Sequence, residues 1–380
     1  MTPLRIFHIV RRTNIGGSEM LIKNIINAND DLNFSHSLVY SFNGPLLVLI
    51  DDSKKSNLIH CRYGNPIFFV FNLRRIIRMN KTDIIHAHQP LDVVYAYFAS
   101  AGLKVKIIRT YHGYEGINRR NPGFSLKNRV LYFLINRFVC LNLFVSNDLM
   151  SYFRYLNTGQ PHTSQRVLYN GVDLNNLAGN KNSNILGERS ISTDSIVLGM
   201  VGGFNTRGRD HITICKALKI VLKINPDVHF LFIGKTMGKF PELYNNCLDY
   251  CKQNGMLRNV HFIGERNDIG GILKELDLYV HSSNNETFGI ALVEAMLSGV
   301  PGIASDIPPF REVSDNGKYL TLFEKGNAED LYDKIRMELK NLRSIETKER
   351  ISNAKLFAEK NFSIQVHIKN LHNLYFECLK

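Results

Sequence analysis

The sequence has no apolar run of the roughly 18 to 20 residues that a membrane-spanning helix requires, and it has no internal repeat or low-complexity tract. These absences argue against a membrane-spanning protein, a solenoid and a disordered chain. The apolar stretch near the N-terminus is short and interrupted by charge, which is not typical of a signal peptide. We therefore expect a globular protein that stays in the cytoplasm, and binding to a membrane surface is still open.

Cysteine is also sparse, with six residues scattered along the chain. The only close pair, Cys247 and Cys251, has no second pair and no histidine cluster near it. The pattern therefore matches neither a zinc site nor a disulfide framework, and a reducing cytosol is the simplest setting.

Charge is present in quantity but unevenly placed. The 380 residues carry a formal net charge of +13. Residues 1–175 contain 21 Lys and Arg against 10 Asp and Glu, whereas residues 176–380 contain 26 against 24. A first half with this excess attracts anionic lipid headgroups, pyrophosphates or nucleic acid, although charge alone also fits a merely soluble surface.

At this length two domains are the natural expectation. Short apolar runs alternate with helical patterns in both halves, which favours two mostly parallel sheets with helices on both faces. The strands expected in the first half are residues 4–10, 37–41, 83–87, 105–110 and 141–145. Those expected in the second half are residues 196–201, 228–233, 260–263, 278–281 and 302–304. Residues 175–194, rich in Asn, Ser and Gly, have the composition of a linker.

The densest cluster of candidate site residues follows the expected strand at residues 278–281. A helix that begins near Thr287 would turn its unpaired N–H groups and positive dipole end towards the strand ends, where they suit a phosphate. Glu286 would lie at the mouth of this helix, and Glu294 roughly 12 Å further along it at ~1.5 Å per residue. Carboxylates so far apart suit different parts of one extended ligand. The spacing equally allows that Glu286 only complements the helix dipole and that Glu294 is a solvated helix residue.

This segment resembles the E-x7-E signature of retaining glycosyltransferases of family 4, which have the two-domain GT-B fold. The resemblance covers residues 16 to 306, with its landmarks in family order. These landmarks are Gly16-Gly17-Ser18-Glu19, His112-Gly113, Val145-Ser146, Asn170-Gly171-Val172-Asp173, Phe262-Ile263-Gly264-Glu265-Arg266-Asn267-Asp268, Glu286 to Glu294, Ala295-Met296, Gly299-Val300-Pro301 and Ala304-Ser305-Asp306.

The resemblance implies an α/β chain of two Rossmann-like, doubly wound parallel-sheet domains that face a central cleft. Residues 1–175 would bind the acceptor, with a C-terminal helix over residues 362–380 packing back on them, and residues 176–361 would bind the donor. The donor would be a UDP- or GDP-linked hexose. The acceptor would be a saccharide, and we expect a lipid-linked one, used in lipopolysaccharide, capsule or exopolysaccharide synthesis at the inner face of the cytoplasmic membrane.

The resemblance also implies roles for single residues. Glu294 would bond the ribose hydroxyls, Glu286 would contact the donor sugar, and the loop at residues 264–268 would receive the base. Gly16 and Gly17 would bring backbone N–H groups close to the diphosphate. The expected donor-binding residues are Gly16, Gly17, Arg266, Thr287, Phe288, Gly289, Ile290 and Glu294. The expected catalytic residues are His112, Arg207, Arg209 and Glu286.

The loop at residues 201–211 departs from the family pattern, which supplies one Arg and one Lys to the diphosphate. Gly203 stands at the usual Arg position, and Arg209 stands where Lys is usual. Arg207 is the candidate to replace the missing guanidinium, because this group can grip phosphate oxygens in a bidentate fork. The alternative is that Arg207 and Arg209 are solvated loop charges.

Three histidines follow strands of the first half. His112 resembles the family histidine that approaches the donor sugar. His86 and His88 could line the acceptor site; their H-x-H spacing could also ligate a metal, but no acidic partner lies nearby in the sequence.

The sequence has no D-x-D motif, so we expect neither a metal nor another cofactor, and Arg207, Arg209 and the helix N-terminus would stabilise the leaving diphosphate. Retention would follow from front-face attack, with the departing phosphate oxygen helping to deprotonate the acceptor.

Two other interpretations of the sequence are weaker. Nucleotide-sugar epimerases and phosphorylases share the two lobes but should lack E-x7-E, and a nucleic-acid-binding protein should show a binding motif beside its charge.

Overall fold

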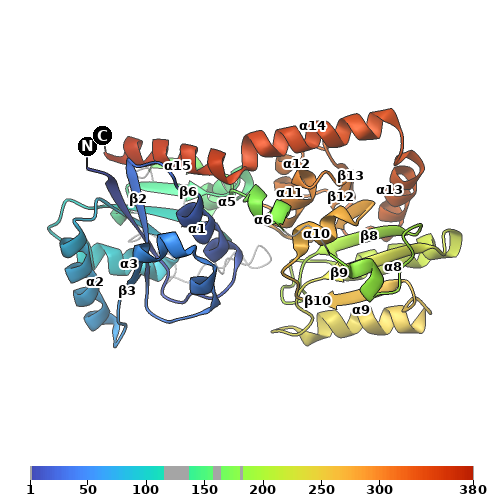
Figure 1. Cartoon of the computed structure of the whole chain (residues 1–380), viewed down its shortest axis with the longest axis horizontal. Coiled ribbons are helices and arrows are strands. Elements are labelled where there is room, and N and C mark those ends of the chain that lie inside the picture. Colours follow the sequence, from blue (N-terminus) through green and yellow to red (C-terminus); the bar gives the residue numbers. More distant parts are fainter. Residues whose placement is uncertain (1, 115–136, 157–163, 180–182, 380) are drawn as a thin grey trace. The chain divides into compact units, whose positions relative to one another are not determined.

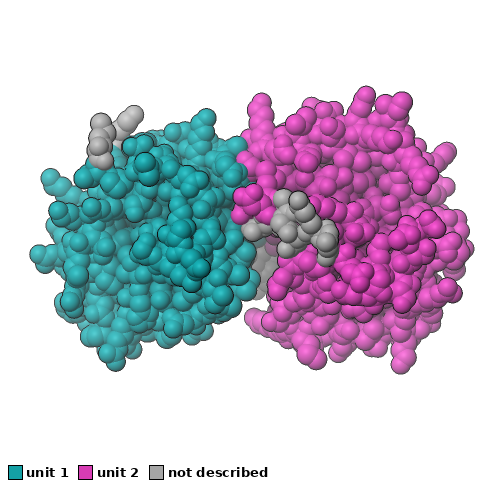
Figure 2. Space-filling model, in the orientation of Figure 1, with its two compact units in different colours: residues 1–172, 364–380 teal, residues 173–363 magenta. Residues whose placement is uncertain are grey.

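The computed structural model describes residues 2–114, 137–156, 164–179 and 183–379. The chain divides into two compact units (Figure 2). Unit 1 comprises Met1–Val172 and Ile364–Lys380, and unit 2 comprises Asp173–Ser363. In the part of the chain that the structure describes, no helix is both long and apolar enough to cross a membrane.

Unit 1 is built on a parallel sheet of seven strands in the order β3-β2-β1-β4-β5-β6-β7 (Figure 1). The strands are β1 (Leu4–Ile9), β2 (Phe34–Tyr40), β3 (Leu58–His60), β4 (Ile84–Ala87), β5 (Lys106–Tyr111), β6 (Leu141–Phe144) and β7 (Ser164–Val167). The helices are α1 (Gly17–Ala28), α2 (Pro66–Asn80), α3 (Pro90–Ser100), α5 (Asn147–Leu156) and α15 (Ile364–Leu379), with two 3-10 helices, η1 (Pro45–Leu49) and η2 (Asp52–Asn57).

Both faces of this sheet are buried, because successive strand residues point to opposite sides and both sides carry helices. Ile6 and Ile84 pack in a cluster with residues of α1 and α15. Phe7 and Ile85 pack on the other face, in a cluster with residues of α2 and α3. Unit 1 is therefore doubly wound.

The last helix of the chain, α15, is part of unit 1 and lies along its sheet (Figure 1). The backbone N–H of Ile364 donates to the carbonyl of Val172 over 2.9 Å. A Cβ atom at Gly171 would lie 2.9 Å from Ile364 Cα, so this glycine lets the helix approach closely. The helix expected over residues 362–380 begins at Ile364, because α14 ends at Phe362.

Unit 2 contains a parallel sheet of six strands in the order β10-β9-β8-β11-β12-β13. The strands are β8 (Ile196–Val201), β9 (Val228–Ile233), β10 (Val260–Gly264), β11 (Leu278–His281), β12 (Gly302–Ser305) and β13 (Thr321–Phe323). The helices are α6 (Leu174–Gly179), α7 (Ile185–Glu188), α8 (His211–Ile224), α9 (Pro241–Gln253), α10 (Ile269–Lys274), α11 (Ile290–Leu297), α12 (Pro308–Val313), α13 (Ala328–Asn341) and α14 (Ile345–Phe362). The two parallel sheets have the architecture of the GT-B fold.

The residues expected to form a linker, 175–194, contain α6 and α7 instead. Leu177 is buried, and a Cβ atom at Gly270 of α10 would lie 2.4 Å from its carbonyl oxygen. Two helices this short carry too little apolar rhythm to be seen in the sequence. The boundaries of unit 2, at Asp173 and Ser363, lie within a few residues of those expected.

The scattered cysteines led us to expect no disulfide framework, and for one pair of cysteines this expectation is wrong. A disulfide joins Cys140, just before β6, to Cys378 in α15. The two cysteines lie 238 residues apart in the sequence and meet only because α15 returns to the sheet of unit 1. The other four cysteines are free and buried.

Candidate functional site

The candidate donor site lies where the strand order of unit 2 reverses. β8 pairs with β9 on one side and with β11 on the other. In doubly wound sheets, ligands bind outside the carboxyl ends of strands at this point. The loop at residues 202–210 leaves β8 here, and the loop at residues 282–289 leaves β11.

Backbone hydrogen bonds join these two loops. The N–H of Asp210 donates to the carbonyl of Ser282 over 3.0 Å, and the N–H of Asn284 donates to the carbonyl of Gly208 over 2.7 Å. A Cβ atom at Gly208 would lie 2.6 Å from the Asn285 carbonyl oxygen, so only glycine permits this approach. The two strand ends thus form one connected rim.

Arg209 lies along this rim. Its Nη1 donates to the Gly203 carbonyl over 3.3 Å. A Cβ atom at Gly202 would lie 2.8 Å from Arg209 Nε, so the glycine makes room for the guanidinium. The positive charge of Arg209 helps lower the pKa of His281 at the end of β11, after burial, to about 3.

Four buried polar atoms of this rim have no hydrogen-bond partner among the described residues. They are Arg209 Nε, His281 Nε2, Ser282 Oγ and Ser283 Oγ. Buried polar groups in proteins are nearly always paired, because an unpaired one costs about 1–3 kcal/mol. A set of donors and acceptors gathered at one pair of strand ends therefore suits a polar ligand.

The helix expected to begin near Thr287 begins instead at Ile290. Gly289, just before it, has φ +97°, a left-handed conformation that interrupts the helix and favours glycine. A Cβ atom there would also lie 2.6 Å from Phe310 Cε1. The N–H groups at the helix mouth are consequently those of the turn at Ile290, and the distance between Glu286 and Glu294 does not follow helical geometry.

The residues expected to bind the donor around this turn fall into two kinds. Phe288 is buried, with its ring 5.5 Å from that of Phe362, so its side chain belongs to the core. The carboxylate of Glu286 accepts a hydrogen bond from the N–H of Thr287 over 3.1 Å. Phe288 and Gly289 can therefore offer a ligand their backbone, whereas Glu286 offers a charge.

Glu294 lies one turn into α11 and is half-buried rather than solvated. Burial raises the pKa of its carboxyl to about 7. Burial and then the charge of Glu294 raise the pKa of the neighbouring Tyr279. The charge of Glu286 also raises this pKa, and that of Arg209 lowers it. The four groups thus lie within one electrostatic neighbourhood, and a small change of surroundings can switch the charge of Glu294.

Arg207 and Arg266 are held by carboxylates. Arg207 is exposed and forms an ion pair with Glu242 at 3.1 Å. Arg266 bonds Asp268 and also reaches Glu188 in α7 at 2.9 Å. Arg266 therefore ties the expected base-binding loop to residues that were expected to form a linker.

The expected site residues of unit 1 lie at the carboxyl ends of its strands. Gly17 is the first residue of α1, which follows β1, and Gly16 precedes it in extended conformation. His112 directly follows β5. Its Nε2 lies 3.0 Å from Nδ1 of His88, so the structure brings these two predicted residues together.

His8, His86 and His88 form a buried group in which one ring nitrogen from each residue lies within 4.8 Å of the other two. This geometry could hold a metal ion. However, the two nitrogens of His86 already lie 2.7 Å from the hydroxyls of Tyr375 and Thr110. The group is therefore satisfied by hydrogen bonds within the protein.

Comparison with known families agrees with this architecture. Residues 15–176 match the family model described as Glycosyltransferase Family 4, and residues 183–356 match that described as Glycosyl transferases group 1. The two models cover nearly all of both units. Together they identify the chain as a family 4-type glycosyltransferase.

Curated relatives of this glycosyltransferase are similar over most of its length. The O-antigen biosynthesis glycosyltransferase WclY of Escherichia coli is 25% identical over 69% of this chain and 71% of that protein. The putative glycosyltransferase EpsF of Bacillus subtilis is 24% identical over 80% of this chain and 79% of that protein. A UDP-Gal:alpha-D-GlcNAc-diphosphoundecaprenol alpha-1,3-galactosyltransferase of E. coli is 26% identical over 72% of both.

Solved structures share the fold of the glycosyltransferase. A glycosyltransferase from Rickettsia africae superposes with a TM-score of 0.84 at 18% identity, over all of both chains. Anabaena Alr3699/HepE in complex with UDP-glucose superposes with a TM-score of 0.82 at 20% identity, over 98% of this chain and all of the other. These similarities confirm the expected GT-B fold.

Sequence reasoning missed several residues of the two regions. The sequence pattern did not single out Ser282 and Ser283, and it predicted His281 only as the end of a strand. In unit 1, the sequence gave no reason to connect His112 with His8, His36 and His372, which come from other strands and from α15. Only the return of α15 brings the last of these close.

Proposed function

We propose that unit 2 binds a nucleoside-diphosphate sugar and that the sugar is transferred, with retention of its anomeric configuration, to an acceptor bound by unit 1. The observation that carries this proposal is the rim of unpaired buried polar atoms at Arg209, His281, Ser282 and Ser283. A diphosphate and a sugar offer the charges and hydroxyls that such a rim needs. UDP and UDP-glucose bound to Anabaena HepE support the ligand class.

Arg209 is the cation best placed for the diphosphate in this proposal. It pairs with Ser283 in the loop that leads into α11, so we propose that its charge and the helix dipole act on the same negative group. Arg207 could join it only after leaving Glu242, because the guanidinium is paired there. Arg207 remains the predicted substitute for the arginine absent at Gly203.

Glu294 is proposed to accept hydrogen bonds from the ribose hydroxyls, and Glu286 to contact the donor sugar. The backbone of residues 264–268 would receive the base, with Arg266 and its carboxylate partners holding that loop in shape. The leaving diphosphate would be stabilised by Arg209 and the helix N-terminus without a metal. Its departing oxygen would take up the acceptor proton, so no protein nucleophile is needed.

The acceptor is proposed to be a lipid-linked saccharide used in surface polysaccharide synthesis. Curated relatives include proteins of O-antigen and capsule synthesis and a transferase named for a diphosphoundecaprenol substrate. Helix α2 of unit 1 fits a membrane surface, because Ile67, Phe71, Arg75 and Arg78 lie on one face at helical spacing and are exposed. Apolar side chains beside basic ones are typical of a helix that lies on anionic lipid.

Calorimetric titration with UDP and GDP in EDTA tests the donor site. We expect one nucleotide to bind wild type, and Arg209→Gln to weaken its binding by about 10- to 100-fold, because a charged hydrogen bond to phosphate contributes roughly 1.5–3 kcal/mol. Arg336→Gln, at an exposed arginine of α13, is the matched control and should bind as wild type does. If neither nucleotide binds, or if Arg209→Gln binds normally, the proposed donor site is wrong.

A further inference from the structure

An arginine with two unpaired guanidinium nitrogens lies just after the first strand of unit 1. Arg11 is two residues beyond the end of β1, and its Nε donates to Oδ1 of Asp92 in α3 over 2.8 Å. Its Nη1 and Nη2 have no hydrogen-bond or ion-pair partner among the residues that the structure describes. Both nitrogens reach solvent, because the side chain is 25% exposed and neither atom is buried. The outer part of this guanidinium is therefore open to a ligand.

Three side chains fix the position of this guanidinium. Cζ of Arg11 lies 6.0 Å from the ring centroid of Tyr63 and 5.2 Å from that of Tyr95, within the range of cation–π contacts. Burial raises the pKa of the Asp92 carboxyl to about 6, although the charge of Arg11 acts in the opposite direction. The carboxylate is thus ionised at neutral pH and stays paired. A guanidinium fixed in this way loses little side-chain entropy when a ligand binds.

The two tyrosines also supply a hydrogen-bond donor. The hydroxyl oxygens of Tyr63 and Tyr95 lie 3.3 Å apart. Each hydroxyl carries one hydrogen, so this contact uses the hydrogen of one tyrosine and leaves that of the other. Neither hydroxyl has a further partner in the described part of the chain. The pair therefore adds a donor beside the guanidinium.

A second arginine and an exposed aromatic surface adjoin this point. Arg12 is exposed, and its Cζ lies 5.7 Å from the ring centroid of Phe42. The Phe42 side chain is 45% exposed, and its ring lies 5.8 Å from that of Tyr63. Phe68, 42% exposed, packs over Gly64, where a Cβ atom would lie 3.0 Å from Phe68 Cδ1. Two positive charges thus lie beside apolar rings that are open to solvent.

These residues come from the carboxyl ends of four adjacent strands. Two follow β1, one follows β2, one follows β3, and two belong to α3 after β4. The strand order β3-β2-β1-β4 brings these ends together, and β1 pairs with β2 on one side and β4 on the other. Ligands of doubly wound sheets bind at such a reversal of strand order. The cluster, named the Arg11 site, consists of Arg11, Arg12, Phe42, Tyr63, Asp92 and Tyr95.

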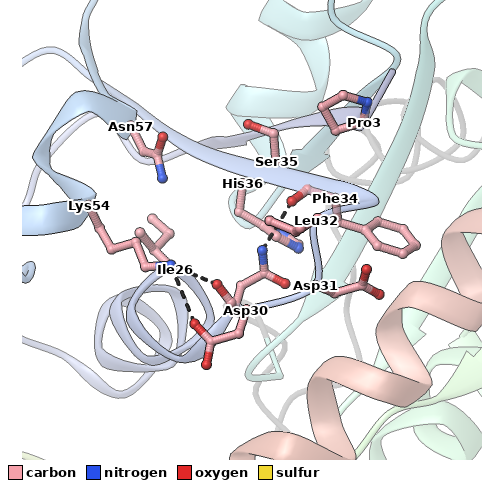
Figure 3. Close-up of a pocket in the computed structure, with 11 residues that line it drawn as sticks. Pro3, Ile26, Asp30, Asp31, Leu32, Phe34, Ser35, His36, Lys54 and Asn57 are labelled. Carbon is pink, nitrogen blue, oxygen red and sulfur yellow. Dashed lines mark hydrogen bonds and ion pairs between the residues drawn. The ribbon is translucent and has the colours of Figure 1, made fainter. Parts of the chain in front are cut away.

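The opposite edge of the same sheet has a different character. An open pocket of about 260 Å³ at the amino ends of β1 and β2 is lined by Asp30, Asp31 and Lys54, among others (Figure 3). Lys54 already pairs with Asp30 at 3.6 Å. An anion would meet two aspartates and an occupied lysine in this pocket, whereas the Arg11 site offers two arginines and one aspartate that is itself paired.

We propose that the Arg11 site binds a phosphate group that is joined to an apolar hydrocarbon tail. A guanidinium fork fits phosphate oxygens, and the two charges of a phosphate match two arginines better than the single charge of a carboxylate does. Phe42 and Phe68 would contact the tail. The assignment of this ligand as the acceptor rests on the proposed transferase function, in which the acceptor is a lipid-linked saccharide. Binding of the phosphate itself does not.

Calorimetric titration with octyl phosphate, below its micelle concentration, tests the site. We expect Arg11→Gln to weaken its binding by about 10- to 100-fold, because a charged hydrogen bond to phosphate is lost, and to leave nucleotide affinity unchanged. Arg209→Gln should show the reverse pattern. If octyl phosphate depends on Arg209 and not on Arg11, the Arg11 site is wrong. If it depends on Arg11 while neither UDP nor GDP binds wild type, the donor site alone is wrong.

Two further ligands separate the phosphate from the tail. Inorganic phosphate has the charge without the tail and should bind more weakly than octyl phosphate. Octyl glucoside has the same tail without the charge, and its binding should be weak and insensitive to Arg11→Gln. Equal affinity for inorganic phosphate would overturn the proposed tail contact, and equal affinity for octyl glucoside would overturn the anion site.

Arg12→Gln keeps the test valid if Arg11→Gln fails to fold, because Arg12 is exposed and packs only over Phe42. It should weaken octyl phosphate binding about threefold, as expected for a solvent-exposed ion pair. Arg75→Gln, at an exposed arginine of α2, is the matched control and should bind as wild type does. Unchanged binding by Arg12→Gln, or an equal loss by Arg75→Gln, would show diffuse attraction to a basic surface and overturn the site.

Discussion

Glu294 shows how one side chain can oppose stability and serve binding. Its carboxyl has a pKa raised from 4.5 to about 7 by burial, so the folded protein favours the protonated form. Between these two pH values the folded state binds more protons than the unfolded state, and stability therefore falls as pH rises through this window. A ribose hydroxyl that donates to the carboxylate would offset part of this loss of stability.

Glu294→Gln should consequently be more stable than wild type at pH 8 and equal to it at pH 4, measured by thermal unfolding without nucleotide. We expect the free energy of unfolding to rise by about 1–2 kcal/mol at pH 8. This is less than the full pKa shift would give at ~1.4 kcal/mol per unit, because solvent reaches part of the side chain. Glu349→Gln, at an exposed residue of α14, is the control and should change neither value. A variant that is less stable at pH 8 would contradict the burial of an ionised carboxylate.

The same variant should bind the nucleotide about 10-fold more weakly, because it loses a charged acceptor. Wild-type binding should itself weaken below pH 7, as the carboxyl takes up a proton. Calorimetry at pH 6 and pH 8 measures both effects.

At the scale of elements, the buried apolar strands were predictable and the short strands at three sheet edges were not. β8, β9 and β11 were expected at the residues where they occur, because each is a buried apolar run bounded by turn residues. β3 and β13 have three residues each and lie at sheet edges, and β7 is the polar segment Ser-Gln-Arg-Val. Such segments carry no periodic pattern, and only pairing with a neighbour makes them strands.

The start of α11 illustrates the same limit within the site. The segment at residues 287–289 has the composition of a helix start, but Gly289 adopts a left-handed conformation against Phe310. That conformation depends on tertiary packing, so local propensity misplaced the first turn by three residues. The identity of the site residues was still inferred from their order along the chain.

The disulfide that attaches helix α15 to the sheet of unit 1 can be tested. The disulfide between Cys140 and Cys378 holds its last turn to the sheet, and four cysteines are free. Thiol titration of the denatured protein should find four thiols before reduction and six afterwards. Cys140→Ser and Cys378→Ser should each lower the stability of unit 1 by about 2–4 kcal/mol, and the double variant by no more than either single one. Six thiols without reduction, or additive losses, would show that the bond does not form.

At the scale of the whole molecule, the distribution of charge bears on the proposed membrane surface. The excess of basic residues belongs almost entirely to the first half of the sequence. On α2, Ile67 is 71% exposed and Phe71 is 67% exposed, beside exposed Arg75 and Arg78. The helix thus combines a surface charge that attracts anionic lipid with apolar side chains that can enter the headgroup region.

Sedimentation with vesicles tests this surface. Wild type should bind vesicles that contain anionic lipid and should be released by salt, because each basic residue near such a surface contributes about 1 kcal/mol and salt screens it. Reversing both charges, Arg75→Glu with Arg78→Glu, should weaken binding at least 10-fold. Arg336→Glu with Lys340→Glu makes the same change in net charge on α13 and should leave binding nearly intact. If the two double variants lose binding equally, net charge and not the face of α2 governs the interaction. If wild type binds neutral vesicles as well as anionic ones, the electrostatic argument is wrong.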